Sequence, residues 1–379
     1  MTSQGMPRRS ALVVLGGIPL ALAVAGRATA SETTAGDLGP GGAFDRFVAG
    51  EAARDRFSGT VLLAHRDRPA LVRAYGMADR SRSIPNRPGT VFALGSITKC
   101  FTGLAVAQLA ARGALRYGDE LSLFLDGFPA GVTVHHLLTH TSGLGRPPLG
   151  AAPVPGSTVD EVFDATLAAI RATPAQFAPG TRYAYSNDGF WILGAIVAKV
   201  SGQSYFDYVR EHVFTPAGMT SADFLTKPRV VADPAVARPY WTQPGGGRID
   251  FTTTPHFEFV RGPDAGAYAT AADLLRFDVA LRAGTLLDPA FADLLTGGKV
   301  PVPPEGRPPM AKQWFTGYGF EHYVVGDRRA YGHPGGGPGI ATNFDSHPEA
   351  GWVAVILGNY DTSIDAIVAR SREFVAEQP

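Results

Sequence analysis

The stretch Gly95-Ser96-Ile97-Thr98-Lys99 opens an apolar helical pattern that runs over residues 98–111. Lys99 follows Ser96 by three positions, so in a helix the two side chains share one face and the ammonium can reach the hydroxyl. The unpaired N–H groups of a helix N-terminus can also stabilise the oxyanion that forms when a serine oxygen attacks a carbonyl. This is the only Ser-x-x-Lys in the chain, and it predicts a nucleophile at Ser96. The alternative for this pattern is an N-capping serine followed by an exposed lysine.

A second polar motif, Tyr185-Ser186-Asn187, ends a turn-rich segment just before a helical pattern at residues 189–200. Its position predicts Tyr185 as a catalytic base and Asn187 as a residue that orients the substrate. A tyrosine serves as a base only if a nearby cation lowers its pKa from about 10, and we expect Lys99 to be that cation. The alternative is a buried tyrosine with an asparagine that caps the next helix.

The third motif is Tyr331-Gly332-His333-Pro334-Gly335-Gly336-Gly337, which we expect at the end of a short strand. His333 is placed to polarise or protonate a leaving group, and Gly335 to let a substrate backbone approach. The amide of Gly336 is the candidate second donor of an oxyanion hole, together with the amide of Ser96, because such a hole needs two converging N–H groups. Taken alone, this segment is also compatible with a glycine-rich hairpin turn.

The order and separation of the three motifs resemble the family of class C β-lactamases, penicillin-binding proteins and related serine esterases and D-aminopeptidases. The resemblance runs from about residue 44 to near the C-terminus and includes Leu137-Leu138-Thr139-His140-Thr141-Ser142-Gly143-Leu144. It implies an α/β domain and an all-α domain with the active site between them. It also implies a cofactor-free serine hydrolase in which Ser96, Lys99 and Tyr185 act through an acyl-enzyme.

The chain departs from the β-lactamase pattern at two places. His333-Pro334-Gly335 stands where β-lactamases carry Lys-Thr-Gly, and Asp264-Ala265-Gly266-Ala267-Tyr268 replaces a more usual Gly-Gly-Leu-like turn. An imidazole is mostly neutral at pH 7, so the site lacks a fixed cation for a substrate carboxylate. This favours an esterase or a D-specific peptidase or amidase. The alternatives are a class C-like β-lactamase or D-Ala-D-Ala carboxypeptidase, and a non-catalytic sensor of β-lactams or peptidoglycan fragments.

Strand patterns near both ends of the chain flank a helical middle. They predict an α/β (α+β) fold in which an antiparallel sheet, built from both termini and flanked by helices, carries an inserted all-α domain. We expect the catalytic domain over residues 44–379, with the α/β part at about 44–95 and 265–379 and the helical part at about 96–264. Further expected elements are helices at 44–57 and 205–213, strands at 318–325 and 329–332, and loops at 146–156 and 300–309.

The first thirty residues have the order of a secretory signal. Arg8 and Arg9 precede an apolar run at residues 11–25, and Ala28-Thr29-Ala30 then gives a cleavage pattern. We predict a signal peptide over residues 1–30, cleaved after Ala30, and a flexible spacer over 31–43. The arginine pair makes the twin-arginine route possible, although its flanks fit that pattern only in part. No later run approaches the roughly 20 apolar residues of a membrane span, so we expect an exported, periplasmic or secreted protein.

Charge and cysteine content exclude several kinds of partner. The chain has 34 basic and 34 acidic side chains, so it has no basic field for a nucleic acid, and we expect a small-molecule ester, amide or peptide substrate instead. The single cysteine, Cys100, excludes an internal disulfide and a cysteine-based zinc site. His136 and His140 lie four apart on an expected helix but lack the glutamate and third ligand of a zinc motif, so we predict no metal site.

Overall fold

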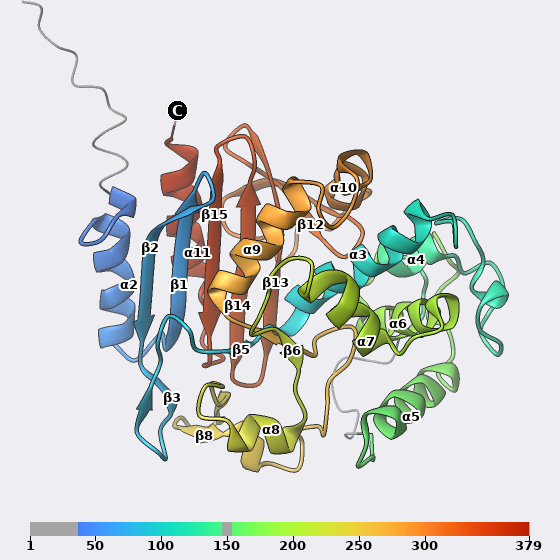
Figure 1. The fold of residues 1–379 in the computed structure, drawn as a ribbon, viewed down its shortest axis with the longest axis horizontal. Coiled ribbons are helices and arrows are strands. Elements are labelled where there is room, and N and C mark those ends of the chain that lie inside the picture. The colour runs from blue at the N-terminus through green and yellow to red at the C-terminus, as the bar shows by residue number, and fades with distance from the viewer. Residues whose placement is uncertain (1–36, 146–153, 379) are drawn as a thin grey trace, which may run out of the picture.

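An eight-stranded antiparallel sheet forms the centre of the computed structural model, which describes residues 37–145 and 154–378 (Figure 1). Strands from both ends of the described chain meet in it. β1 (Gly59–His65) pairs with β15 (Trp352–Gly358) on one side and with β2 (Arg68–Tyr75) on the other. The predicted antiparallel sheet built from both termini is therefore confirmed.

The strand order across the sheet is β10-β11-β12-β13-β14-β15-β1-β2. β15 has the sequence WVAVILG and is buried along its whole length, as expected for an apolar strand covered on both faces. The remaining strands of the sheet are β10 (Val300–Pro301), β11 (Ala311–Thr316), β12 (Glu321–Val325), β13 (Arg328–Gly337) and β14 (Ile340–His347).

Helices cover both faces of the sheet. α2 (Ala43–Ala53) and α11 (Asp365–Ala376) pack on one face through an apolar cluster that includes Phe44, Val61 and Val368. α9 (Ala271–Arg282) lies on the opposite face, in front of the strands in Figure 1. The apolar side chains of the central strands are thus removed from water on both sides, which is the main stabilising contribution in such a layered domain.

A group of helices lies beside the sheet and is built around α3 (Thr98–Ala111) (Figure 1). Almost every residue of α3 is buried, because its sequence is apolar on all sides apart from Lys99 and three uncharged polar residues, Thr98, Thr102 and Gln108. Gly103 is required in α3, since a Cβ there would lie 1.9 Å from the carbonyl oxygen of Tyr318. The other helices outside the sheet layers are α4 (Val134–Leu138), α5 (Val159–Arg171), α6 (Asn187–Ser201), α7 (Tyr205–Val209), α8 (Lys227–Ala232) and α10 (Pro289–Thr296).

Several expected boundaries were wrong. The helix expected over residues 44–57 ends at Ala53, and the chain turns with Asp55 at a φ of 55°. The strand expected over 318–325 begins at Glu321, because Gly319, at a φ of 81°, forms a turn before it. The helix expected over 205–213 is α7 followed by a π-helix, Arg210–Phe214, and the loop expected over 300–309 begins with β10.

The largest difference is in β13, which the sequence predicted as a short strand ending at Gly332. β13 continues through the glycines to Gly337, so the His333 motif lies within a strand and not in a hairpin turn. Its residues pair in register with β14, from Tyr331↔Ser346 to Gly337↔Ile340. Backbone pairing with a neighbouring strand thus overrides the low intrinsic strand preference of proline and glycine.

Three short strands near the centre of the molecule pair with one another, and they were not predicted from the sequence. β5 (Phe92–Ala93) pairs with β9 (Ala267–Ala269), which in turn pairs with β6 (Asp223–Phe224). Strands this short show no alternation of apolar and polar residues, so they carry no sequence signal. Through β9 they bring the segment 264–269 next to the start of α3.

Some predictions fall on residues that the structure does not describe. The signal peptide over 1–30, its cleavage after Ala30, the arginine pair and the start of the spacer lie outside the described residues, as does most of the loop at 146–156. Within residues 37–145 and 154–378, no helix has the length and apolar character needed to cross a membrane.

Candidate active site

Ser96 lies at the centre of a 3-10 turn, Gly95–Ile97, that leads directly into α3. The sequence placed it in the first turn of the α-helix, and the structure places it just before that turn. Gly95 has a φ of 57°, and its carbonyl oxygen accepts a hydrogen bond of 2.7 Å from the Thr98 hydroxyl. A glycine tolerates this left-handed backbone without strain. Ser96 at this turn lines a cavity together with residues of β11, β12 and β13.

Lys99 is fully buried and its ammonium nitrogen lies among three oxygens. Nζ is 3.2 Å from Ser96 Oγ, 2.8 Å from Asn187 Oδ1 and 2.9 Å from the backbone oxygen of Asp264. Burial disfavours the charged form and lowers the pKa of Lys99 to about 8. A neutral amine has two N–H groups and one lone pair. If the N–H groups bind Asn187 and Asp264, the lone pair faces the Ser96 hydroxyl and can accept its proton.

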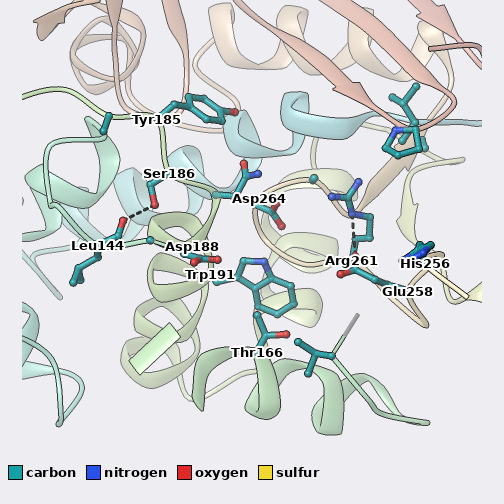
Figure 2. A pocket seen from close by; sticks show the side chains of 18 of the residues that line it. Leu144, Thr166, Tyr185, Ser186, Asp188, Trp191, His256, Glu258, Arg261 and Asp264 are labelled. Carbon is teal, nitrogen blue, oxygen red and sulfur yellow. Dashed lines mark hydrogen bonds and ion pairs between the residues drawn. The ribbon is translucent and has the colours of Figure 1, made fainter. Parts of the chain in front are cut away.

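Tyr185 and Asn187 lie on either side of the cap of α6. Ser186 is the N-cap: its hydroxyl accepts a hydrogen bond from Gly189 N and donates one of 2.7 Å to Leu144 O, which anchors the turn (Figure 2). Asn187 then begins the helix with its side chain directed to Lys99. The structure thus brings both predicted residues to Ser96, and the Ser96 hydroxyl lies close enough to the Tyr185 hydroxyl to lower its pKa in part.

The pKa of Tyr185 is raised and not lowered as expected, although Lys99 lies close to it. Lys99 Nζ does lie 4.9 Å from the centre of the Tyr185 ring. Desolvation of the hydroxyl nevertheless raises the pKa of Tyr185 above its ordinary value, although 42% of the residue is exposed and the Ser96 hydroxyl opposes this rise. Near neutral pH Tyr185 therefore carries its proton and can donate it. The sequence could not show how deeply the hydroxyl is enclosed.

His140 packs against Tyr185, and it was not assigned to the site from the sequence. Its ring stacks on Tyr185 with 4.4 Å between centres, and its Nδ1 accepts a hydrogen bond of 3.0 Å from Ser186 N. His140 has a φ of 58° and lies beyond the end of α4, so it does not share a helix face with His136 as expected. His136 Nδ1 instead accepts a hydrogen bond from Thr133 N at the start of α4.

Among the described residues, no group of three or more His, Cys, Asp or Glu side chains is placed to hold a metal ion.

His333 is buried on β13, facing the cavity at Ser96. Its Nδ1 lies 2.6 Å from the Pro334 carbonyl oxygen, which can only accept, so Nδ1 carries the proton. Burial, with a smaller contribution from Lys99, lowers the pKa of His333 to about 3. The imidazole is therefore neutral at physiological pH, as the sequence predicted from its residue type. Its Nε2 faces Glu321 Oε1 at 3.8 Å, and this contact is not an ion pair because the imidazole is uncharged.

The glycine segment of β13 lies against the turn that carries Ser96. β12 pairs with β13 only as far as Gly332, so beyond it β13 has β14 on one side and no paired strand on the other. A Cβ on Gly95 would lie 3.1 Å from Gly336 N, which places this amide beside the serine turn. A Cβ on Gly336 would meet no atom within 4 Å, whereas a Cβ on Gly335 would lie 2.2 Å from Leu94 O. Gly336 thus faces open space, and Gly335 packs against the protein.

Two cavities meet at the Ser96–Tyr185 region. One, of about 560 Å³, is lined by Ser96, Tyr183, His333, Gly336 and Glu321, among others. The other, of about 600 Å³, lies beyond Tyr185 and Asn187 (Figure 2). In Figure 2, Trp191 lies at its floor, Asp188 and Asp264 border it, and Arg261 is joined to Glu258 at its far side. Further apolar side chains line the second cavity: Leu144, Val154, Phe177, Phe251, Phe257 and Ile340.

Sequence reasoning missed three contributions to this site: the Asp264 carbonyl oxygen, the His140 support and the buried carboxyl of Glu321. Asp264 lies in a segment that sequence reasoning had singled out only as a departure from the family pattern. A backbone oxygen carries no residue-type signal, and its approach to Lys99 depends on the pairing of β5 with β9. Glu321 follows a Tyr-Gly-Phe turn, and only the folded sheet brings it next to His333.

Comparison with known proteins gives one consistent family. The Beta-lactamase family model matches residues 44–376. Esterase EstB of Burkholderia gladioli is 33% identical over 325 residues, which cover 76% of this chain and 81% of EstB. The putative penicillin-binding protein PbpX of Bacillus subtilis (strain 168) is 33% identical over 234 residues, which cover 61% of this chain and 56% of PbpX. The chain thus spans little more than half of the length of PbpX.

Solved structures agree with the sequence matches. A penicillin-binding protein from Bacillus halodurans has a TM-score of 0.75 and 28% identity to this chain, covering 86% of this chain and 98% of its own. The fold shared with this structure accounts for the sheet, the flanking helices and the helical part beside them. The chain belongs to the β-lactamase family of serine hydrolases.

Proposed function

We propose that this protein is an exported esterase that cleaves uncharged carboxylic esters through an acyl-enzyme on Ser96. The observation that carries the proposal is the position of Ser96 Oγ. It lies 3.2 Å from a buried lysine with a lowered pKa, it lines the same cavity as Tyr185, and it is next to the Gly336 amide of β13. A nucleophile, a base and converging donors are the groups that acyl transfer requires.

In the first step Lys99, as the neutral amine, accepts the Ser96 proton while Oγ bonds to the ester carbonyl carbon. The backbone N–H groups of Ser96 and Gly336 donate to the oxygen that becomes negative. When the tetrahedral intermediate collapses, the carbon–oxygen bond to the alcohol breaks. The alcohol oxygen takes a proton from Tyr185, and the Tyr185 oxygen then regains one from the ammonium of Lys99, whose Nζ lies 4.9 Å from the centre of the Tyr185 ring.

In the second step water replaces the alcohol. Lys99 accepts a proton from the water, whose oxygen attacks the acyl carbon and releases the carboxylic acid. The proton returns to Ser96 Oγ as the acyl bond breaks, so the enzyme is restored. Asn187 holds one N–H of Lys99 through both steps and keeps its lone pair directed at the reacting oxygen.

The preference for uncharged esters rests on the chemistry of the His333 side. His333 is neutral, and no lysine or arginine is among the described residues that line the cavity next to it. A substrate carboxylate would therefore lose its hydration without gaining an ionic partner. The similarity to EstB, named an esterase, also supports ester hydrolysis.

The test compares kcat/KM for p-nitrophenyl butyrate, a D-Ala-D-Ala peptide and the β-lactam nitrocefin. We expect kcat/KM for the uncharged ester to exceed kcat/KM for both carboxylate-bearing substrates by at least tenfold. A factor of this size corresponds to the loss of one charge-assisted hydrogen bond to the substrate carboxylate. If nitrocefin is cleaved with a higher kcat/KM than every neutral ester tried, the protein is a β-lactamase and the esterase proposal is wrong.

The similarity to PbpX favours a second candidate, a protein that binds β-lactams or peptidoglycan fragments without turnover. The two candidates differ in stoichiometry. A binder releases at most one equivalent of p-nitrophenol per protein molecule, whereas an esterase releases product at a constant rate over many turnovers.

Export is part of the proposal and rests on residues 1–30, with their arginine pair, apolar run and Ala28-Thr29-Ala30. We expect the mature protein to begin at Ser31 and to be recovered outside the cytoplasm, whether in the periplasm or in the medium. N-terminal sequencing of the exported protein checks this, and a different first residue or retention of the full chain contradicts it.

A further inference from the structure

Glu321 is a buried carboxyl at the cleft for which the proposed mechanism has no use. It begins β12 and pairs with Gly332 on β13 and Thr316 on β11. Its side chain is 3% exposed, yet it lines the cavity that also contains Ser96 and His333. Buried glutamates are rare unless they are paired, so the contacts of Glu321 decide what it can do.

The contacts of Glu321 provide one firm donor and no cation. Trp314 Nε1 donates a hydrogen bond to Glu321 Oε2. The other oxygen, Oε1, faces His333 Nε2 at 3.8 Å. Because His333 gives its single ring proton to the Pro334 carbonyl, Nε2 has only a lone pair to offer. His333 therefore cannot neutralise the carboxylate.

The other titratable groups that face Glu321 do not neutralise it either. Cys100 and Lys99 approach from α3, Tyr183 and Tyr185 from the loop before α6, and Tyr323 from β12 itself. Among these described neighbours Lys99 is the only cation. Its Nζ lies within hydrogen-bond distance of Ser96, Asn187 and Asp264, and not of Glu321.

We propose that Glu321 is the residue that excludes carboxylate-bearing substrates from the His333 side of the cleft, so that this side accepts uncharged or amine-bearing groups. The inference rests on the proposed function, since it assigns the substrate class of the same site. The cavity here is lined by two carboxyl groups, Glu321 and the exposed Glu305, and by no lysine or arginine among the described residues. A substrate carboxylate in it would meet like charge.

Rejection of a carboxylate should depend on pH. Burial raises the pKa of Glu321 to about 7, while the Trp314 hydrogen bond and Lys99 act in the opposite direction. The carboxyl is therefore mostly neutral at pH 6 and mostly charged at pH 8, so its repulsion of an anion grows over this range. Lys99 reacts in the same neutral form with every substrate, so its titration cancels in a ratio of two substrates.

The experiment measures kcat/KM for two matched pairs of esters with purified full-length mature protein. One pair is mono-p-nitrophenyl succinate and its methyl ester, which differ by a carboxylate on the acyl side. The other pair is 4-acetoxybenzoate and its methyl ester, which differ by a carboxylate on the alcohol side. In each pair the acid is ionised throughout pH 6–8.5, and the ratio of acid to methyl ester reports only the response to its charge.

For at least one pair we expect the wild-type ratio to fall about tenfold from pH 6 to pH 8. We expect Glu321→Gln, which keeps an oxygen for Trp314, to raise the ratio at pH 8 about tenfold and to remove its pH dependence. The fraction of molecules with a neutral Glu321 at pH 8 sets this limit, because two unit charges a few ångströms apart at an effective dielectric constant of about 20 repel by more than this factor. The pair that responds identifies whether the acyl or the alcohol group lies beside His333.

Two variants with the same chemical change serve as controls. Glu305→Gln removes the exposed carboxylate at the rim, where solvent screens charge, and should change the ratio less than threefold. Glu349→Gln alters an exposed turn between β14 and β15, at the end of β14 away from Ile340, and should leave the ratio unchanged. The wild-type pH series needs no variant, so the inference stays testable even if Glu321→Gln does not fold.

Two results would overturn the inference. If esters turn over but neither wild-type ratio falls between pH 6 and pH 8, or Glu321→Gln leaves both ratios unchanged, Glu321 does not select substrates, while the proposed esterase stands. If no ester in either pair turns over, the proposed function fails, and the inference fails with it.

Discussion

Lys99 is the residue on which the chemistry of this site depends. When the neutral amine of this buried lysine donates its two N–H groups to Asn187 Oδ1 and Asp264 O, its lone pair is directed at Ser96. Because burial lowers its pKa to about 8, a substantial fraction is neutral near physiological pH. Tyr185 has the opposite shift and keeps its proton. The two groups are therefore suited to different tasks, Lys99 as the base and Tyr185 as the acid.

This division of roles predicts a pH profile. We expect kcat/KM for a neutral ester to rise about tenfold per pH unit below pH 8 and to level off above it, since only neutral Lys99 can accept the Ser96 proton. Lys99→Arg cannot lose its charge in this range and should lower kcat/KM by about 10² to 10⁴. Lys312→Arg, at a side chain that is 60% exposed, is the matched control and should retain activity. A profile that is flat from pH 6 to pH 9 would exclude Lys99 as the base.

The sequence predicts the residue types of this site better than their electrostatics. The spacing of Ser96 and Lys99 on one helical face was enough to predict that they meet, and the neutral state of His333 followed from its intrinsic pKa. The pKa of Tyr185 depends on how much protein surrounds its hydroxyl, and the contact of Lys99 with Asp264 joins positions 165 residues apart. Neither can be read from spacing, because both are produced by tertiary packing.

At the scale of elements, the glycine half of β13 joins the sheet to the serine turn. β14 holds this half in register, and the Thr342 hydroxyl on β14 donates a hydrogen bond of 2.8 Å to Leu94 O, just before that turn. The result is a strand edge with no paired neighbour at the position where Ser96 faces the cavity. The Gly336 nitrogen lies beside this turn, and we propose its N–H as an oxyanion donor.

Two substitutions at Gly336 distinguish the role of its N–H group from the role of its missing side chain. Gly336→Ala adds a methyl group into open space and should change kcat only a few-fold. Gly336→Pro removes the N–H and should lower kcat by about 10² to 10³, the usual loss for one oxyanion donor. Melting temperatures of both variants report whether the strand is intact. Equal activity of the two variants would show that the Gly336 amide is not an oxyanion donor.

The sequence predicted a strand at β13 but ended it at Gly332, before its glycine half. Proline and three glycines are unfavourable in strands, and local preference alone therefore indicated a turn. The strand persists because β14 supplies a ladder partner from Gly337 back to Tyr331. A long periodic element such as α3 was predicted correctly, whereas short strands such as β5 and β9 have too few residues to show a period.

At the scale of the whole molecule, the C-terminal helix is fixed to the sheet by a buried ion pair. Arg372 on α11 donates to both carboxylate oxygens of Asp345 on β14, at 2.8 and 3.0 Å. The side chains are 1% and 0% exposed. Burial opposes ionisation of Asp345, but the guanidinium outweighs it and lowers the pKa of Asp345 below its ordinary value. β14 also borders the active site, so this pair joins the helix layer to the strands that carry the site.

Removing one partner of this pair should be strongly destabilising. We expect Arg372→Met to lower the free energy of unfolding at pH 7 by about 3 to 5 kcal/mol, because it leaves a buried carboxylate without its partner. Arg370→Met, two positions away at a side chain that is 38% exposed, is the control and should cost under about 1 kcal/mol. Urea unfolding followed by circular dichroism measures both, and equal costs would mean that the pair is not a main support of the fold.

The same pair predicts how stability depends on pH. Asp345 has a lower pKa in the folded than in the unfolded chain, so its contribution is present above the unfolded pKa of about 3.9 and is lost as the pH falls through the lower folded pKa. The unpaired carboxyl of Arg372→Met takes up a proton at a higher pH than the paired one, so the difference in unfolding free energy between wild type and variant should shrink steadily as the pH falls from 7 toward the lowered folded pKa of Asp345. A difference that stays constant from pH 7 to pH 3 would contradict this assignment.

The overall architecture could be predicted from the sequence because strands at both ends of a chain have few ways to bury their apolar faces other than to pair with each other. The pairing of β1 with β15 is that solution. Its register and the choice of which helices cover which face depend on side-chain packing between distant segments, which no local pattern records.

The central claim is that Ser96 is the nucleophile, and covalent labelling tests it most directly. Intact-protein mass spectrometry after treatment with a fluorophosphonate should show one adduct on the wild-type protein. Ser96→Ala should show no adduct and no ester turnover, with its melting temperature unchanged, because alanine is well tolerated at a helix start. Ser122→Ala, at an exposed serine, should label like the wild type. An adduct that persists on Ser96→Ala would show that another residue is the nucleophile.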